Sequence, residues 1–88
     1  MPSLRVTRRA DQHIEQLPDG LRGAVLNALL RVRAQPTEAG TPLRGRMRGT
    51  WVARIGSYRI LYTIEGAEAS VTVVVRAVLH RAVAYRRP

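Results

Sequence analysis

The sequence predicts an α+β domain, in which an N-terminal short strand and a helical hairpin pack on a twisted, mostly antiparallel sheet of three or four strands. Two periodicities predict this class: apolar residues recur at helical spacing before residue 36, and they alternate with period two after residue 50. In addition, only Gly56-Ser57 separates two of the alternating segments, as in a two-residue hairpin. With 88 residues, the chain is expected to form a single domain spanning 1–88.

The first strand and the first helix are expected before residue 18. Ser3–Val6 alternates, and its apolar residues are expected to point inward. Thr7 is suited to cap the helix that follows, and Pro18 ends it. The inward face of this helix combines Ala10, Ile14 and Leu17.

A second helix follows at once, which makes the pair a helical hairpin. Asp19 is the expected N-cap, and Pro36 stops the helix. The apolar stripe consists of Leu21, Val25, Leu29 and Val32, widened by Leu26 and Leu30. From Pro36 to Thr50 the sequence is rich in turn formers and has no regular period, so a loop is expected. This loop carries an arginine at every second position: Arg44, Arg46 and Arg48.

The hairpin places two arginines opposite each other. Trp51–Ile55 and Tyr58–Ile64 are predicted strands, and the two-residue turn pairs Arg54 with Arg59. The residues expected on the core face are Trp51, Ala53, Ile55, Tyr58, Ile60, Tyr62 and Ile64. Like charges directly opposite each other are destabilising, so this pairing favours an anion, such as phosphate, between the two guanidinium groups.

The last strand is expected over Ser70–Leu79, after a four-residue loop at 66–69. The expected pairs are Tyr62 with Val73, Ile60 with Val75, and Arg59 with Arg76. His80 lies four residues after Arg76, so regular alternation places both side chains on the same face of the sheet. We therefore predict three arginines in a row on one sheet face, with a histidine further along it.

The charge of the chain restricts its partners and its chemistry. Fifteen basic residues against six acidic ones give a net charge of +9, which favours polyanionic partners and salt-sensitive association. The chain has no cysteine and no apolar run that could span a bilayer, so a cytoplasmic protein without disulfides or membrane contact is expected. Its carboxylates are scattered along the sequence, and neither a metal site nor a small-molecule cofactor is expected.

Three motifs stand out in the second half of the chain. They are Pro42-Leu43-Arg44-Gly45, the hairpin 51–62, and a Val-rich strand that ends in His80-Arg81 with Tyr85 four residues on. Together with the helical hairpin, they resemble the RelE branch of the RelE/ParE toxin superfamily over nearly the whole chain. RelE-like toxins are ribosome-dependent endoribonucleases that cut mRNA in the decoding site, and an antitoxin wraps and blocks them. The resemblance therefore implies a bacterial type II toxin whose partners are an acidic antitoxin, the ribosome and mRNA.

The resemblance also implies roles for individual residues. The arginine of the family's Tyr-Arg motif falls on Arg59, and the arginine after the last strand falls on Arg81. The C-terminal tyrosine proposed as general base falls on Tyr85, and Arg54 takes the place of a basic residue before the turn. Val52 is a departure, because some catalytic members have another basic residue there.

The residue types support RNA cleavage without a metal ion, and they leave two candidates, Tyr85 and His80, for the proton acceptor. Attack of a 2′-hydroxyl on the adjacent phosphorus needs a proton acceptor and compensation for the growing negative charge, which guanidinium groups supply. Tyr85 would act as the base only if surrounding arginines favour its anion, whereas His80 has a side chain suited to proton transfer near neutrality. The candidate catalytic residues are Arg54, Arg59, His80, Arg81 and Tyr85. The candidate RNA-binding residues are Arg44, Arg46, Arg48, Arg76, Arg86 and Arg87.

Two other functions remain open at this point. ParE-like relatives share the fold but inhibit DNA gyrase, and a catalytically inactive basic RNA-binding module could act as a co-repressor with its antitoxin. The combination of Arg59, Arg81 and Tyr85 favours the nuclease over both.

Overall fold

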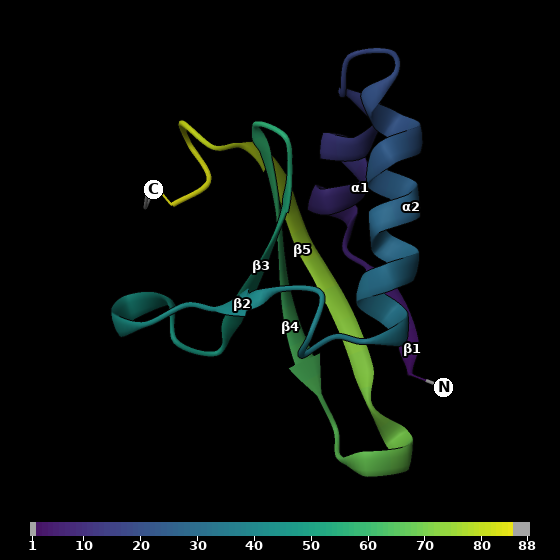
Figure 1. Cartoon of the computed structure of the whole chain (residues 1–88), viewed down its shortest axis with the longest axis vertical. Coiled ribbons are helices and arrows are strands. Elements are labelled where there is room, and N and C mark those ends of the chain that lie inside the picture. Colours follow the sequence, from purple (N-terminus) through teal and green to yellow (C-terminus); the bar gives the residue numbers. More distant parts are fainter. Residues whose placement is uncertain (1, 86–88) are drawn as a thin grey trace.

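Both helices lie on one face of a single five-stranded sheet, as Figure 1 shows for this computed structural model. The structure describes residues 2–85, apart from the side chain of Glu68. The elements are β1 (Ser3–Val6), α1 (Arg8–Glu15), α2 (Leu21–Ala34), β2 (Thr41–Pro42), β3 (Thr50–Ile55), β4 (Tyr58–Glu65) and β5 (Thr72–His80). Two short 3-10 turns, Gly45–Met47 and Glu68–Ser70, lie in the connections. Within this range, neither helix has the length and hydropathy that a membrane span requires.

The expected α+β class is confirmed, with one strand more than expected. The strand order is β1-β5-β4-β3-β2, in which β1 runs parallel to β5 and all other neighbours are antiparallel. The additional strand, β2, pairs Thr41 with Val52 and Pro42 with Trp51. A strand of two residues is too short to show an alternating pattern, and the backbone of proline has no N–H to donate a hydrogen bond to a neighbouring strand. The sequence therefore carries no signal for this strand.

The start of α1 follows the prediction, and the start of α2 does not. The Thr7 Oγ1 accepts a hydrogen bond from the Ala10 N–H at 3.1 Å, so Thr7 caps α1 as expected. Asp19 does not cap α2, because the N-cap is Gly20 and no side chain bonds to the helix end. Gly20 has a φ of 91°, a left-handed conformation that favours glycine where the chain reverses between the helices.

Two leucines of α2 lie outside the core, contrary to the prediction. Leu26 and Leu30 are 48% and 55% exposed. The buried residues of the helix are Val25, Ala28, Leu29 and Val32. A helix that lies on a sheet buries only the side chains that face the sheet, so the stripe is narrower than expected and includes Ala28.

The main core lies between the helices and the sheet, and all seven inward residues predicted for the hairpin contribute to it. Tyr62 is fully buried; its hydroxyl donates to the Pro36 carbonyl at 2.6 Å, and burial raises the pKa of Tyr62 to about 12. Only glycine fits at position 40, since a Cβ there would meet the Tyr62 hydroxyl and lie 2.8 Å from the Val52 carbonyl oxygen. This contact fixes the beginning of the loop that carries Arg44, Arg46 and Arg48, called the arginine loop below.

The last strand is paired two residues further along than expected. Glu65 pairs with Thr72, and Tyr62 pairs with Val75, because the connection extends to residue 71 instead of 69. A shift of two residues leaves each side chain of the strand on the same face of the sheet, because side chains alternate with period two. Val73 and Val75 are therefore buried in the main core, as predicted.

A β-bulge at Arg76 interrupts the alternation of β5. The neighbouring pairs skip this residue: Leu61 pairs with Ala77, and Tyr62 pairs with Val75. Arg76 is therefore the extra residue of the bulge. The prediction that it lies opposite Arg59 is wrong, because the partner of Arg59 is Leu79.

The bulge also reverses the faces of the residues that follow it. Val78 belongs to the main core, and His80 pairs with Tyr58, which packs on that core, so both face the helices. Ala77 and Leu79 pack on the opposite face of the sheet. We call the sheet face that carries Arg54 and Arg59, on the side away from the helices, the arginine face. The prediction that His80 lies on the arginine face is therefore wrong.

His13 attaches α1 to the edge of β5. The pairing of β1 with β5 ends at Val75, and beyond it the Val78 N–H donates to His13 Nδ1 at 3.1 Å. The bond requires a lone pair on Nδ1, so the imidazole is neutral. Burial, and after it the charge of Arg9, lowers the pKa of His13 below its usual 6.5.

We expect the fold to lose stability in mild acid because of His13. The contribution of a group with a lowered folded pKa is fully present above the unfolded value, about 6.5 for histidine, and is lost as the pH falls through the folded value. Urea unfolding at about pH 7.5 and about pH 5 measures this loss. His13→Asn offers Oδ1 as a non-titrating acceptor and should show a smaller difference between the two midpoints. Equal differences in both proteins would contradict the role of His13.

Candidate active site

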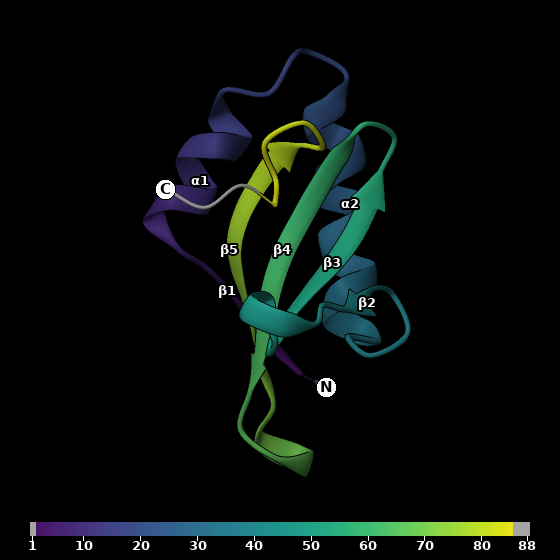
Figure 2. The same ribbon diagram turned by 90° about the vertical axis from the view of Figure 1, so that its left-hand side faces the viewer.

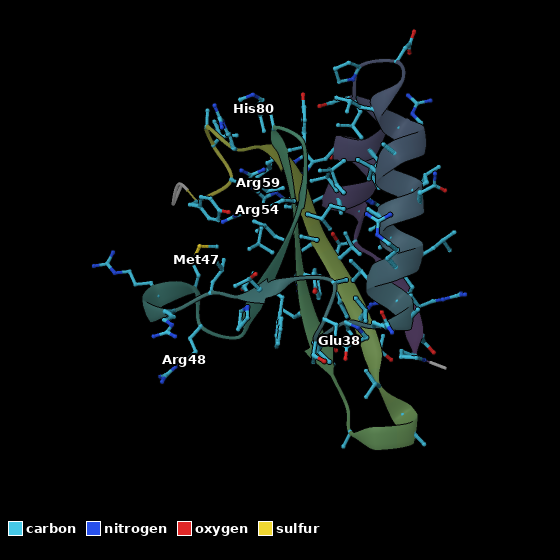
Figure 3. The ribbon with its side chains drawn as sticks, in the orientation of Figure 1. Glu38, Met47, Arg48, Arg54, Arg59 and His80 are labelled. Atoms are coloured by element: carbon cyan, nitrogen blue, oxygen red, sulfur yellow. The ribbon has the colours of Figure 1, made fainter. Side chains whose placement is uncertain are left out.

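Arg54 on β3 and Arg59 on β4 form the centre of the candidate site. They pair directly across the hairpin, as predicted. Figure 3 shows both side chains on the face of the sheet that points away from the helices. Arg54 is exposed and Arg59 is partly buried, so the hairpin holds two cations side by side at the surface.

The guanidinium group of Arg59 is held by its own turn. Its Nη1 donates to the carbonyl oxygens of Gly56 at 3.0 Å and Tyr58 at 2.9 Å. These carbonyl dipoles offset part of the repulsion from Arg54, so a bound anion is not the only group that can compensate it. The Nε of Arg59 is buried without an acceptor among the residues that the structure describes.

The Gly56-Ser57 turn connects Arg59 to the C-terminal segment. The Gly56 carbonyl accepts from the Arg59 side chain, and the Ser57 carbonyl accepts from the Arg81 backbone N–H at 2.7 Å. Gly56 has a φ of 56°, which favours glycine at the first position of the turn. Two consecutive carbonyls therefore hold the side chain of Arg59 and the backbone of Arg81, the two arginines predicted to stabilise charge.

Beyond β5 the chain turns back over the arginine face of the sheet, as Figures 1 and 2 show. The His80 carbonyl accepts from the N–H groups of Val83 at 2.9 Å and Ala84 at 3.1 Å. Ala84 is buried and Tyr85 is 41% exposed, so the turn is anchored while the tyrosine side chain stays accessible. The contacts predicted for Arg86 and Arg87 lie outside the described residues.

A small second core on the arginine face supports the arginine loop. Leu43, Met47 and Leu79 pack there against the buried residues Val52, Leu61 and Ala77. The loop arginines, Arg44, Arg46 and Arg48, are all exposed. Figure 3 shows the side chains of Met47 and Arg48 on opposite sides of the loop, and Met47 packs on the second core. The loop covers part of this face, and the C-terminal turn crosses it further along (Figure 2).

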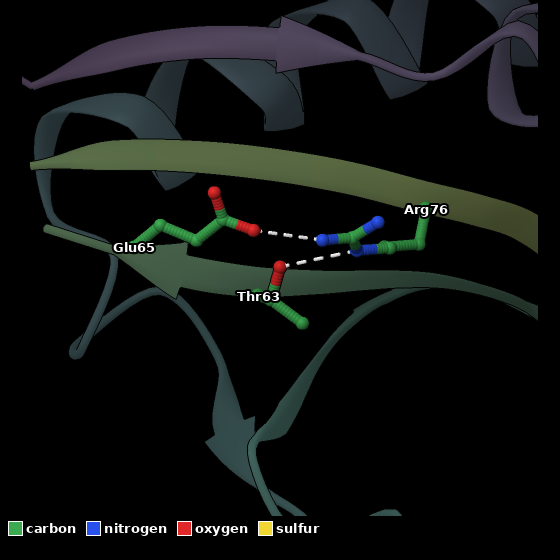
Figure 4. Close-up of polar contacts among 3 residues, drawn as sticks. All are labelled: Thr63, Glu65 and Arg76. Carbon is green, nitrogen blue, oxygen red and sulfur yellow. Dashed lines mark hydrogen bonds and ion pairs between the residues drawn. The ribbon is translucent and has the colours of Figure 1, made fainter.

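The side chain of Arg76 forms its polar contacts with Thr63 and Glu65, toward the end of β4 that lies far from Arg59. Its Nη2 lies 2.8 Å from Glu65 Oε2, and its Nε donates to Thr63 Oγ1 at 3.2 Å (Figure 4). The two charged side chains are 45% and 49% exposed, so their ion pair contributes at most about 1 kcal/mol. The carboxylate nevertheless neutralises Arg76, and the RNA contact predicted for it lacks the three-arginine row on which it rested.

Comparison with known proteins places this arrangement in a family. The sequence matches the family described as ParE toxin of type II toxin-antitoxin system, parDE, over residues 4–85. The chain therefore belongs to the ParE toxin family, within the RelE/ParE superfamily.

The proteins found to be similar by sequence or by structure include toxins named RelG and RelE. Toxin RelG of Mycobacterium tuberculosis is 38% identical over 86 residues, 97% of each chain. The toxin-antitoxin complex RelBE2 of Mycobacterium tuberculosis contains a chain with a TM-score of 0.81 and 35% identity, covering 92% of this chain and 100% of that one. The isolated RelE toxin of E. coli has a TM-score of 0.74 at 24% identity, covering 100% of this chain and 88% of that one, which shows the shared fold. The resemblance to the RelE/ParE superfamily is therefore confirmed.

We expect Gly56→Ala to disturb the positions of Arg59 and Arg81 together. A Cβ at position 56 meets open space, but the φ of 56° is unfavourable for alanine by roughly 1 kcal/mol. The relaxed turn should expose the Arg81 amide, which hydrogen-exchange NMR would detect as faster exchange. Gly45→Ala is the matched control, because Gly45 has a φ of 66° and open space but lies in the arginine loop. An equal change at Arg81 in both variants would argue against the coupling.

Proposed function

We propose that this protein is the toxin of a type II toxin–antitoxin pair and cleaves mRNA as a ribosome-dependent endoribonuclease. The observation that carries the proposal is the pairing of Arg54 with Arg59, with the backbone of Arg81 bonded to the same turn. Family membership and 38% identity to Toxin RelG support the toxin class. The cluster of guanidinium groups favours a phosphate ligand, because guanidinium is planar, permanently charged and able to bind two oxygens at once.

The proposed reaction is a transesterification within the RNA. The 2′-oxygen attacks the adjacent phosphorus, the bond from phosphorus to the 5′-oxygen breaks, and the products are a 2′,3′-cyclic phosphate and a 5′-hydroxyl. A base takes the 2′-hydroxyl proton, and the leaving 5′-oxygen takes up a proton from water. Arg54, Arg59 and Arg81 stabilise the charge that develops on the phosphate oxygens, a role that needs no metal ion.

Substrate recognition in this proposal relies on the RNA backbone. The exposed arginines of the loop add positive charge to the sheet face that carries Arg54 and Arg59. Trp51, Tyr58 and Tyr62 belong to the main core and offer no stacking surface on this face. Phosphate contacts position an RNA without reading its bases, so the ribosome would present the message and the toxin would supply the charges.

Arg59→Ala should reduce cleavage far more than Arg46→Ala, although both remove one positive charge. Loss of a donor that acts on the transition state decreases the rate by roughly 100- to 1000-fold. Arg46 lies in the loop, so its loss should weaken RNA binding and leave the chemical step intact. Single-turnover cleavage of ribosome-bound mRNA, measured with a chelator present, tests both points. Arg54→Ala provides a second probe of the pair, since Arg54 is exposed and its removal leaves the turn bonds in place.

Several outcomes would reject the nuclease proposal. Growth arrest that survives Arg59→Ala and Arg54→Ala unchanged would show that the arginine pair is not the active site. Replication arrest with continuing translation would identify a gyrase inhibitor, the activity of ParE-like relatives. Tight RNA binding without cleavage would identify a co-repressor module.

We further propose that an acidic antitoxin binds the arginine face. The chain of similar structure from Mycobacterium tuberculosis is part of a toxin-antitoxin complex. Here, the net charge of +9 favours an acidic segment, and the pairing of β2 with β3 ends at Val52, which leaves the backbone of 53–55 as an edge for strand addition.

Antitoxin binding should weaken as salt rises, mainly through slower association. Stopped-flow mixing of the toxin with its cognate antitoxin would measure the on-rate at low and high ionic strength. Arg48→Ala should slow association more than Arg31→Ala, which removes an equal charge from an exposed position on α2. Equal effects of the two variants would place the antitoxin elsewhere on the protein.

A further inference from the structure

His80 lies where β5 ends and the C-terminal turn begins, and it binds three successive N–H groups of that turn. Its Nδ1 accepts from the Ala82 N–H at 3.1 Å. Its carbonyl accepts from the Val83 and Ala84 N–H groups, at 2.9 and 3.1 Å. The first of these bonds has the form of an Asx turn, in which a side chain accepts from the backbone two residues on.

The orientation of the His80 ring separates it from the arginines. His80 pairs with Tyr58, and the two rings meet edge to face, with centroids 5.4 Å apart and an interplanar angle of 84°. The ring lines a shallow pocket together with His13, Gln16 and Leu17 of the helical layer. The arginine pair lies on the other face of the sheet, so the ring does not point toward the proposed phosphate site.

The hydrogen bond at Nδ1 also determines the chemistry of the ring. Because Nδ1 accepts the Ala82 N–H, the neutral imidazole carries its proton on Nε2. In this tautomer the Nδ1 lone pair is occupied and Nε2 is a donor. No free lone pair remains to accept the proton of a 2′-hydroxyl, so the ring as placed is not a general base.

We propose that His80 is a positioning residue that holds the C-terminal turn, and with it Arg81 and Tyr85, over the arginine face. Its Nδ1 accepts the Ala82 N–H at the start of the turn, and the Ser57 carbonyl accepts the neighbouring Arg81 N–H. The effect on cleavage rests on the proposed nuclease function, whereas the anchoring of the turn does not. With His80 in this role, Tyr85 is the side chain left to accept the proton.

Three substitutions separate positioning from proton transfer. His80→Asn places Oδ1 where Nδ1 was and can form the same turn without titrating, whereas His80→Gln places its polar atoms one bond further out. His80→Ala removes the acceptor. All three remove the contact with the Tyr58 ring, so a difference between Asn and Gln isolates the Nδ1 bond. Thermal unfolding of each variant establishes that the fold is retained.

Hydrogen exchange at the Ala82 amide is the first readout, because it requires no catalysis. We expect protection to persist in His80→Asn and to fall roughly 2- to 10-fold in His80→Gln and His80→Ala, the range for one lost hydrogen bond. Single-turnover cleavage should follow the same order, with near-normal rates for Asn and losses of up to about 100-fold for the other two, because the turn is misplaced. Tyr85→Phe should lose cleavage with the Ala82 amide still protected.

Two results would overturn the proposal. If His80→Asn protects the Ala82 amide and yet cleaves as slowly as His80→Ala, the imidazole transfers a proton. If the Ala82 amide exchanges equally in all three variants and in the parent protein, Nδ1 does not anchor the turn. A parent protein that cleaves no RNA would reject the nuclease function, and the exchange measurement would still decide the anchoring.

Discussion

The two-residue turn between β3 and β4 is the constraint on which the candidate site depends. Because the turn contains only Gly56 and Ser57, the register of the hairpin leaves Arg54 no partner other than Arg59. The same turn directs one carbonyl to the Arg59 side chain and the next to the Arg81 backbone. One short segment thus creates the repulsion between two cations and supplies the dipoles that reduce it. Such a stored charge conflict is typical of a site built to bind an anion.

The bulge at Arg76 has the opposite effect, because it separates residues that an uninterrupted strand would bring together. One extra residue moves His80 from the arginine face to the helix face and removes Arg76 from the row of arginines. It also brings Ala77 and Leu79 onto the arginine face, where they complete the second core. The bulge therefore exchanges two polar side chains of the site for an apolar support under the arginine loop.

That second core explains the departure at Val52. Some catalytic members of the RelE branch have a basic residue at the position of Val52. Here the Val52 side chain is 3% exposed and packs with Leu61 beneath the arginine loop. A buried cation without a partner would be costly at such a position. The positive charge on this part of the face comes instead from Arg44, Arg46 and Arg48, which the apolar anchors Leu43 and Met47 hold in place.

Local signals in the sequence determined the α+β class, the cap at Thr7, the hairpin register and the seven core residues of the hairpin, because short-range spacing specifies each of these. They also carried the resemblance to RelE/ParE toxins. Only the tertiary structure decided the pairing of β5, the side on which His80 lies, the ion pair of Arg76 with Glu65 and the bond of His13 to the edge of β5. These features depend on a bulge and on contacts between residues far apart in the chain, and alternation along one strand contains no information about where it will be interrupted.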